Sequence, residues 1–64
     1  MKVHLQDGSS RTLRGGVARV SEVLLALDLN PAAVIVSRDG KVIPDDAVLG
    51  ADDEIRVISV SHGG

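Results

Sequence analysis

The first residues of the chain alternate between apolar and polar positions. Met1, Val3 and Leu5 are apolar, whereas positions 2, 4 and 6 are polar, which is the period of a half-buried β-strand. Residues 7–10 have the composition of a turn. We expect residues 11–14 to return as a second and weaker strand, because only Leu13 is clearly apolar there. The pattern therefore predicts a β-hairpin over residues 1–14.

The hydrophobic period changes after the two glycines at positions 15 and 16. Apolar residues then recur at the i, i+3, i+4 and i+7 positions that form one helix face, and they are Val20, Val23, Leu24 and Leu27. Glu22 suits the first turn of a helix. Ser21 is a candidate N-cap, although the apolar stripe formed by these four residues begins one residue before it. Leu25 lies off the stripe, and Pro31 stops the helix. The pattern predicts a helix over residues 20–28.

The second half of the chain returns to strand patterns. Residues 34–38 and 41–43 are predicted strands joined by Asp39-Gly40, the sequence favoured in a tight type I′ hairpin turn. Residues 45–53 are expected to form a polar connection with a single apolar plug at Val48-Leu49. The last predicted strand covers residues 54–60.

The predicted element order is ββαββ followed by a last strand. One helix covers only one sheet face, and its connection between strands calls for a right-handed crossover. The compact solution is an α+β fold of the β-grasp (ubiquitin-like) type, with a mixed sheet packed on one helix and the first and last strands as central parallel neighbours. The expected core consists of Val3, Leu5, Val20, Leu24, Leu27, Val36, Ile55 and Val57.

The amino-acid composition disfavours several classes of function. The 64 residues suffice for one domain, contain no cysteine or aromatic residue, and carry a net charge of −2. Direct nucleic-acid binding is disfavoured because a basic surface and stacking rings are missing. No signal peptide or membrane-spanning run is visible, so we expect a cytoplasmic protein without a membrane partner. His4 and His62 are expected to be solvated, and two histidines without cysteines predict no metal site.

Two further features concern possible partners. The acidic residues at positions 45, 46, 52, 53 and 54 either form a solvated loop or steer a basic partner surface. On the last strand, Ile55 and Val57 share one face while Ile58 and Val60 share the other. Ile58 and Val60 are therefore either core residues of a strand buried on both sides, or an exposed apolar patch that docks a partner.

The printed sequence ends in Gly63-Gly64, directly after a predicted strand. Glycine has no Cβ and can pass through a slot too narrow for other residues. Residues 61–64, expected to be a flexible tail behind a domain of residues 1–60, span at most about 14 Å when extended. This reach would carry the carboxylate of Gly64 into the active site of another protein. A carboxylate is ionised and unreactive as an acyl donor, so a partner must activate it.

The chain resembles the ubiquitin-like sulfur carriers of the ThiS/MoaD family. Residues 20–27 fit that family's V-x-E-L-L-x-x-L pattern, and Leu29-Asn30-Pro31 fits the L-N-P that often follows. Residues 36–44 fit its strand–turn–strand segment ending in proline, and residues 52–55 fit its G-D-E-V pattern, with Ala51 in place of the glycine. The second half looks especially similar to archaeal small modifier proteins and bacterial tRNA-thiolation carriers.

The resemblance implies a carrier that is not itself an enzyme and binds no cofactor. An E1-like adenylyltransferase would use ATP to adenylate Gly64, and a sulfur donor would convert it to a thiocarboxylate. A downstream sulfur-accepting enzyme would then use that sulfur in tRNA thiolation or in thiamine or molybdopterin synthesis. Gly63 and His62 would lie in the partner's channel, and Ile58 and Val60 would dock it. The alternatives are a protein modifier joined through Gly64 to target lysines, and a non-covalent interaction module.

Overall fold

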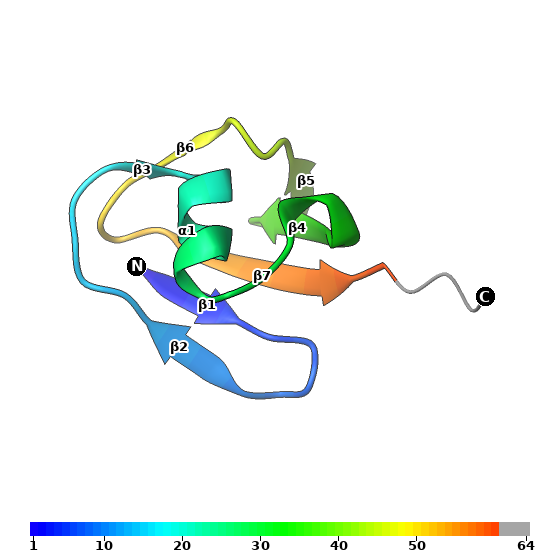
Figure 1. Ribbon diagram of the computed structural model, residues 1–64. Coiled ribbons are helices and arrows are strands. Elements are labelled where there is room, and N and C mark those ends of the chain that lie inside the picture. Colours follow the sequence, from blue (N-terminus) through cyan, green and yellow to red (C-terminus); the bar gives the residue numbers. More distant parts are fainter. Residues whose placement is uncertain (61–64) are drawn as a thin grey trace.

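The computed structural model describes residues 1–60 and contains a mixed five-stranded sheet with one helix across it. The strand order is β2-β1-β7-β4-β5. These strands are β2 (Ser10–Thr12), β1 (Lys2–His4), β7 (Glu54–Ser59), β4 (Val34–Arg38) and β5 (Lys41–Ile43). In Figure 1 the orange β7 lies between the blue β1 and the green β4. The predicted hairpin and the predicted central pair are both confirmed.

The first and last strands form the only parallel pair among the described strands of this sheet. Val3 is level with Ile55 in the β1–β7 pair, and the neighbouring β4 pairs with β7 in the antiparallel sense, with Val36 level with Val57. Because side chains alternate between the two faces of a strand, these four residues point to one face. The fold is the predicted β-grasp arrangement.

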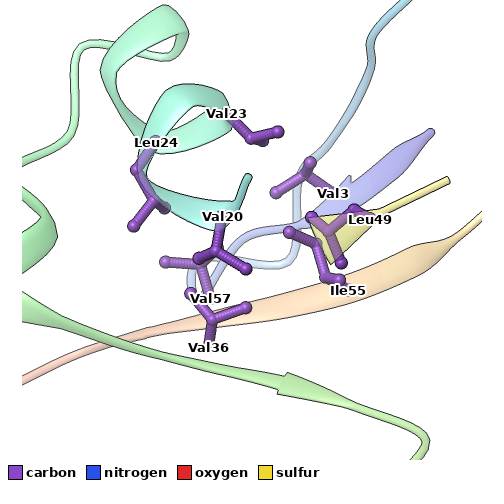
Figure 2. Packing of buried hydrophobic residues seen from close by; sticks show 8 residues of the cluster. All are labelled: Val3, Val20, Val23, Leu24, Val36, Leu49, Ile55 and Val57. Carbon is purple, nitrogen blue, oxygen red and sulfur yellow. The ribbon is translucent and has the colours of Figure 1, made fainter. Parts of the chain in front are cut away.

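Helix α1 (Val20–Ala26) supplies the other side of the core. Its Val20, Val23 and Leu24 are buried against the strands, as Figure 2 shows, while Leu25 is exposed. The complete buried cluster is Val3, Val20, Val23, Leu24, Val36, Leu49, Ile55 and Val57. Leu5 and Leu27, which were expected in the core, are half-buried at its margin, because the first strand ends at His4 and the helix ends at Ala26.

The predicted polar connection over residues 45–53 was wrong in one respect. The two apolar residues of this connection form a short strand, β6 (Val48–Leu49), which pairs with β3 (Ala18–Arg19) in a separate two-stranded sheet. Leu49 is fully buried, and it closes the end of the core next to β1 and β7. A two-residue strand has too short a pattern to be recognised from alternation.

The helix starts without a conventional side-chain cap, and Ser21 is not its N-cap. The N-cap is Arg19, whose backbone N–H donates to Glu22 Oε1 at 2.8 Å. The next two amides, those of Val20 and Ser21, donate to the carbonyls of Ala47 at 2.9 Å and Asp45 at 2.8 Å. The connection before β6 therefore satisfies N–H groups that a helix start leaves unpaired.

The β4–β5 hairpin has the turn that its sequence predicts. Asp39 and Gly40 have φ values of 54° and 78°, and a type I′ turn requires a positive φ at both central residues. Pro31 to Ala33 form a 3₁₀ turn, η1, which joins the helix to β4. The predicted bounds of β4 and β5 are confirmed.

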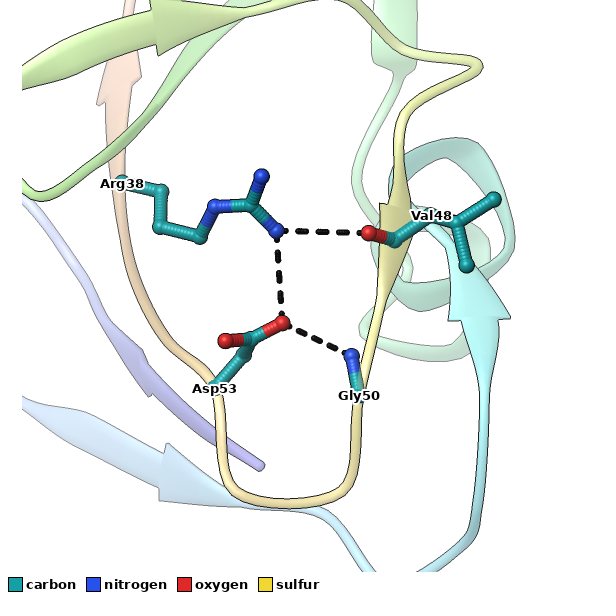
Figure 3. A network of polar contacts seen from close by, with 4 residues as sticks. All are labelled: Arg38, Val48, Gly50 and Asp53. Atoms are coloured by element: carbon teal, nitrogen blue, oxygen red, sulfur yellow. Dashed lines mark hydrogen bonds and ion pairs between the residues drawn. The ribbon is translucent and has the colours of Figure 1, made fainter.

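One member of the acidic group is part of the fold. Asp53 Oδ2 accepts from the Gly50 amide at 2.7 Å and pairs with Arg38 Nη1 at 3.3 Å. The same guanidinium nitrogen donates to the Val48 carbonyl at 3.2 Å. Figure 3 shows that these contacts join the end of β4 to both sides of the loop before β7. Asp53 is thus half-buried and is not a freely solvated steering charge.

We predict that Leu24→Ala lowers the free energy of unfolding by about 2–5 kcal/mol. Leu24 is 1% exposed and packs between the helix and the sheet, so the truncation leaves a cavity in a small core. Chemical denaturation followed by circular dichroism measures the change. The matched control is Leu25→Ala on the exposed helix face, which should alter stability by less than about 0.5 kcal/mol. Equal effects of the two substitutions would contradict the helix orientation.

We also predict that Asp53→Ala lowers the free energy of unfolding by about 1–2 kcal/mol, because it removes an acceptor from both Gly50 and Arg38. Asp53→Asn keeps an oxygen for the Gly50 amide and should lose less. The control is Asp52→Ala, since Asp52 is its exposed neighbour. The same denaturation experiment compares them, and a larger loss in Asp52→Ala would show that the contacts in Figure 3 contribute little.

Candidate functional site

Within residues 1–60, no element covers the face of the sheet opposite α1, and this face carries an apolar group at the end of β7. Ile58 lies level with Ile35 of β4, and both point away from the core because Ile55, Val57 and Val36 point into it. Ile58 is 41% exposed, Ile35 40% and Val60 37%. Val42 of β5 is 72% exposed on the same face, but it is level with Ser37 and so with Arg56, nearer the start of β7. We call Ile35, Ile58 and Val60 the open-face patch.

The exposure of Ile58 and Val60 excludes one interpretation of the last strand, a strand buried on both sides, and leaves docking of a partner as a prediction. Neither belongs to the buried cluster, so β7 is not buried on both sides. Sequence reasoning missed Ile35. The same signal was available for Ile35, because it stands between Val34 and Val36 and a period of two places it on the opposite face.

The opposite end of the same face is charged. His4 of β1 and Glu54 of β7 form a hydrogen bond between Nε2 and Oε1, and Arg56 lies level with His4 on β7. His4, which was expected to be solvated, has a side chain that is 29% exposed and also has a carboxylate partner. These residues line an open hollow of about 340 Å³ together with Ser37 and Asp39.

The electrostatics of this charged end follow from the same contact. The hydrogen bond with His4 lowers the pKa of Glu54, and the nearby positive charges of His4, Lys2 and Arg56 act in the same direction. Because the pKa of Glu54 is lowered in the folded protein, its carboxylate contributes fully to folding stability at pH values above its ordinary, unfolded-state pKa. That contribution is lost as the pH falls through the lowered pKa of the folded state. Two members of the acidic group, Asp53 and Glu54, therefore have partners within the domain.

The base of the C-terminal segment is held on both edges of β7. The Ser59 amide donates to Gln6 Oε1 at 2.8 Å, and the Val60 amide donates to the Ala33 carbonyl at 2.9 Å. The predicted functional residues beyond this point, His62, Gly63 and Gly64, lie outside the described residues, as does the predicted tail over residues 61–64. The structure thus places the candidate docking residues and leaves the reacting residue as a prediction.

Residues 1–60 show neither a metal-binding cluster nor a membrane-spanning helix. No group of three or more metal-ligating side chains occurs there. The α-helix of residues 1–60 has seven residues, and no helix in this part of the chain is long and apolar enough to span a bilayer.

Comparison with known proteins agrees with the resemblance seen in the sequence. The model of the ThiS family matches residues 4–64, which is nearly the whole chain and includes both terminal glycines. No curated protein sequence matches the chain. The ThiS family is a family of small β-grasp sulfur carriers that interact with E1-like activating enzymes and with sulfur-transfer enzymes. With its β-grasp sheet, its single helix and this match, the chain belongs to the ThiS family.

Proposed function

We propose that Gly64 is the residue through which this carrier holds sulfur. The observation that carries the proposal is the family match through residue 64, on a chain whose glycine pair follows the rigid strand β7 by a few residues. The partner supplies the catalysis, and this domain supplies the carboxylate and the surface by which the partner holds it.

Two steps convert the carboxylate into a sulfur donor. In the first, a Gly64 carboxylate oxygen attacks the α-phosphorus of ATP in an E1-like adenylyltransferase, and pyrophosphate leaves. In the second, a sulfide equivalent from the sulfur donor attacks the carbonyl carbon of the acyl-adenylate, and AMP leaves. The product is a thiocarboxylate, which a downstream enzyme uses for tRNA thiolation or for thiamine or molybdopterin synthesis.

The open-face patch suits docking because of where it lies. Four extended residues reach at most about 14 Å, so an active site that receives Gly64 must lie within that distance of Val60. A partner that close to Val60 covers the end of β7, where Ile58 and Val60 are exposed beside Ile35. Exposed apolar patches on small domains commonly mark partner surfaces.

The alternative function uses the same activated residue. If a lysine amine attacks the acyl-adenylate instead of sulfide, Gly64 becomes joined to a target protein through an amide bond. The contacts within residues 1–60 do not favour sulfur transfer over conjugation to lysine, because both routes share the adenylation step. Intact-mass analysis of the protein from its own cells, with a search for lysine-linked Gly-Gly remnants, separates the two routes.

We predict that Ile58→Glu raises the KM for activation by the cognate E1-like enzyme by about tenfold or more, because it places a charge in an apolar contact. The melting temperature should change little, since Ile58 is outside the buried cluster. Initial rates of pyrophosphate release measure KM. The control Leu25→Glu places the same charge on the exposed helix face, and an equal effect of both substitutions would exclude the open-face patch as the docking surface.

We predict that Gly63→Ala and deletion of Gly64 abolish activation while the domain stays folded. The deletion shortens the reach by about 3.5 Å, and misplacement by 1 Å can cost about a hundredfold in rate. Incubation with the E1-like enzyme, ATP and sulfide should add the mass of an oxygen-to-sulfur exchange to the wild type only. A deletion variant activated at the wild-type rate would overturn the proposal and favour a non-covalent interaction module.

A further inference from the structure

The last hydrogen bond on one edge of β7 is made by a side chain. Strand β1 ends at His4, so it offers no backbone acceptor to the amide of Ser59 further along β7. Gln6 Oε1 accepts from that amide at 2.8 Å. The side chain of Gln6 therefore continues the sheet by one bond beyond the point where the main chain of β1 turns away.

The loop that carries Gln6 is closed by its own hydrogen bonds. The Leu5 amide donates to the Ser9 carbonyl at 2.8 Å, and the Gly8 amide donates to the Leu5 carbonyl at 3.1 Å. Asp7 Oδ1 accepts from the Ser9 amide at 2.9 Å and from the Ser9 hydroxyl at 2.6 Å. These two bonds lower the pKa of Asp7, so the acceptor stays ionised. Gln6 therefore lies in a turn whose conformation is held by these hydrogen bonds.

The opposite edge of β7 is fixed by the 3₁₀ turn η1. The Val60 amide donates to the Ala33 carbonyl at 2.9 Å. Asn30 holds this turn in place, because its Oδ1 accepts from the Ala32 amide at 3.0 Å and its carbonyl accepts from the Ala33 amide at 2.9 Å. Two consecutive amides, those of Ser59 and Val60, are therefore bonded to loops on opposite sides of the strand.

We propose that Gln6 is a positioning residue for Gly64. By holding Ser59, it keeps the end of β7 in the strand conformation and fixes the point from which the reach to Gly64 begins. This inference rests on the proposed function of Gly64. Its physical basis is that a fixed starting point narrows the positions open to a reacting group and so reduces the conformational entropy lost in the reaction.

The surroundings of this bond favour positioning over stability. The bond between Gln6 and Ser59 is exposed to solvent and both residues lie outside the buried cluster. When an exposed hydrogen bond is lost, water replaces the partner, so the fold loses little. The end of the strand, in contrast, loses the one bond that residues 1–60 make to that edge beyond β1, and strand ends that lack partners fray.

The test compares Gln6→Met, which keeps the side-chain length and removes the acceptor, with Gln6→Glu, which keeps an acceptor oxygen. Each is assayed with the cognate E1-like enzyme, ATP and sodium sulfide, with pyrophosphate release and thiocarboxylate mass as readouts. For Gln6→Met we expect kcat to fall by about tenfold with KM nearly unchanged. Gln6→Glu should restore most of kcat. Ser10→Ala, an exposed change in the adjacent strand, should resemble the wild type.

Amide hydrogen exchange gives an independent readout. The Ser59 amide should exchange faster in Gln6→Met than in the wild type, whereas the Val57 amide should not change. The inference is overturned if Gln6→Met keeps the wild-type kcat, or if Gln6→Glu fails to restore it. Failure of the proposed function would look different, because the wild type itself would then gain no sulfur.

Discussion

The parallel pairing of β1 with β7 is the constraint on which the rest of this structure depends. It joins residues 2–4 to residues 54–56, so nearly the whole chain must close before these strands meet. Closing this long loop costs conformational entropy, and burial of Val3 and Ile55 between the sheet and α1 offsets that cost. Because β1 and β7 run in the same direction, the connection between them must cross the sheet, and α1 is part of that crossing.

Much of this arrangement could be predicted because each long element has a clear period. The stripe on residues 20–27 located the helix face, and Asp39-Gly40 located the β4–β5 turn. Ser21 was a wrong N-cap because the helix start is satisfied by carbonyls of residues 45 and 47, which are distant in sequence. The strand β6 was missed for a related reason, since its two residues are defined by their partner β3 and by the burial of Leu49.

The candidate site also contains some residues that the sequence pattern identifies and others that only the structure identifies. Ile58 and Val60 could be identified from the double apolar pattern of the last strand, and their exposure confirms that they are outside the core. Ile35 becomes their neighbour only through the register of β4 against β7. Gln6 had no sequence signal at all. A glutamine in a turn looks like a solvated side chain, and its proposed role depends on β7 continuing three residues beyond Arg56, which is level with the last residue of β1.

One sheet face is uncovered within residues 1–60 because the single α-helix of this part of the chain covers only the other face. A domain of this size buries only about 60% of the surface that its unfolded form exposes. The two ends of the uncovered face differ: His4, Glu54 and Arg56 make the start of β7 charged, whereas Ile35 and Ile58 make its end apolar. If the proposed partner binds by burial of apolar surface, Ile35 and Ile58 favour its contact with the end of β7 over the charged start of the strand. The contrast between the two ends of one sheet face would then orient the partner toward the end of β7 that precedes Gly64 in the sequence.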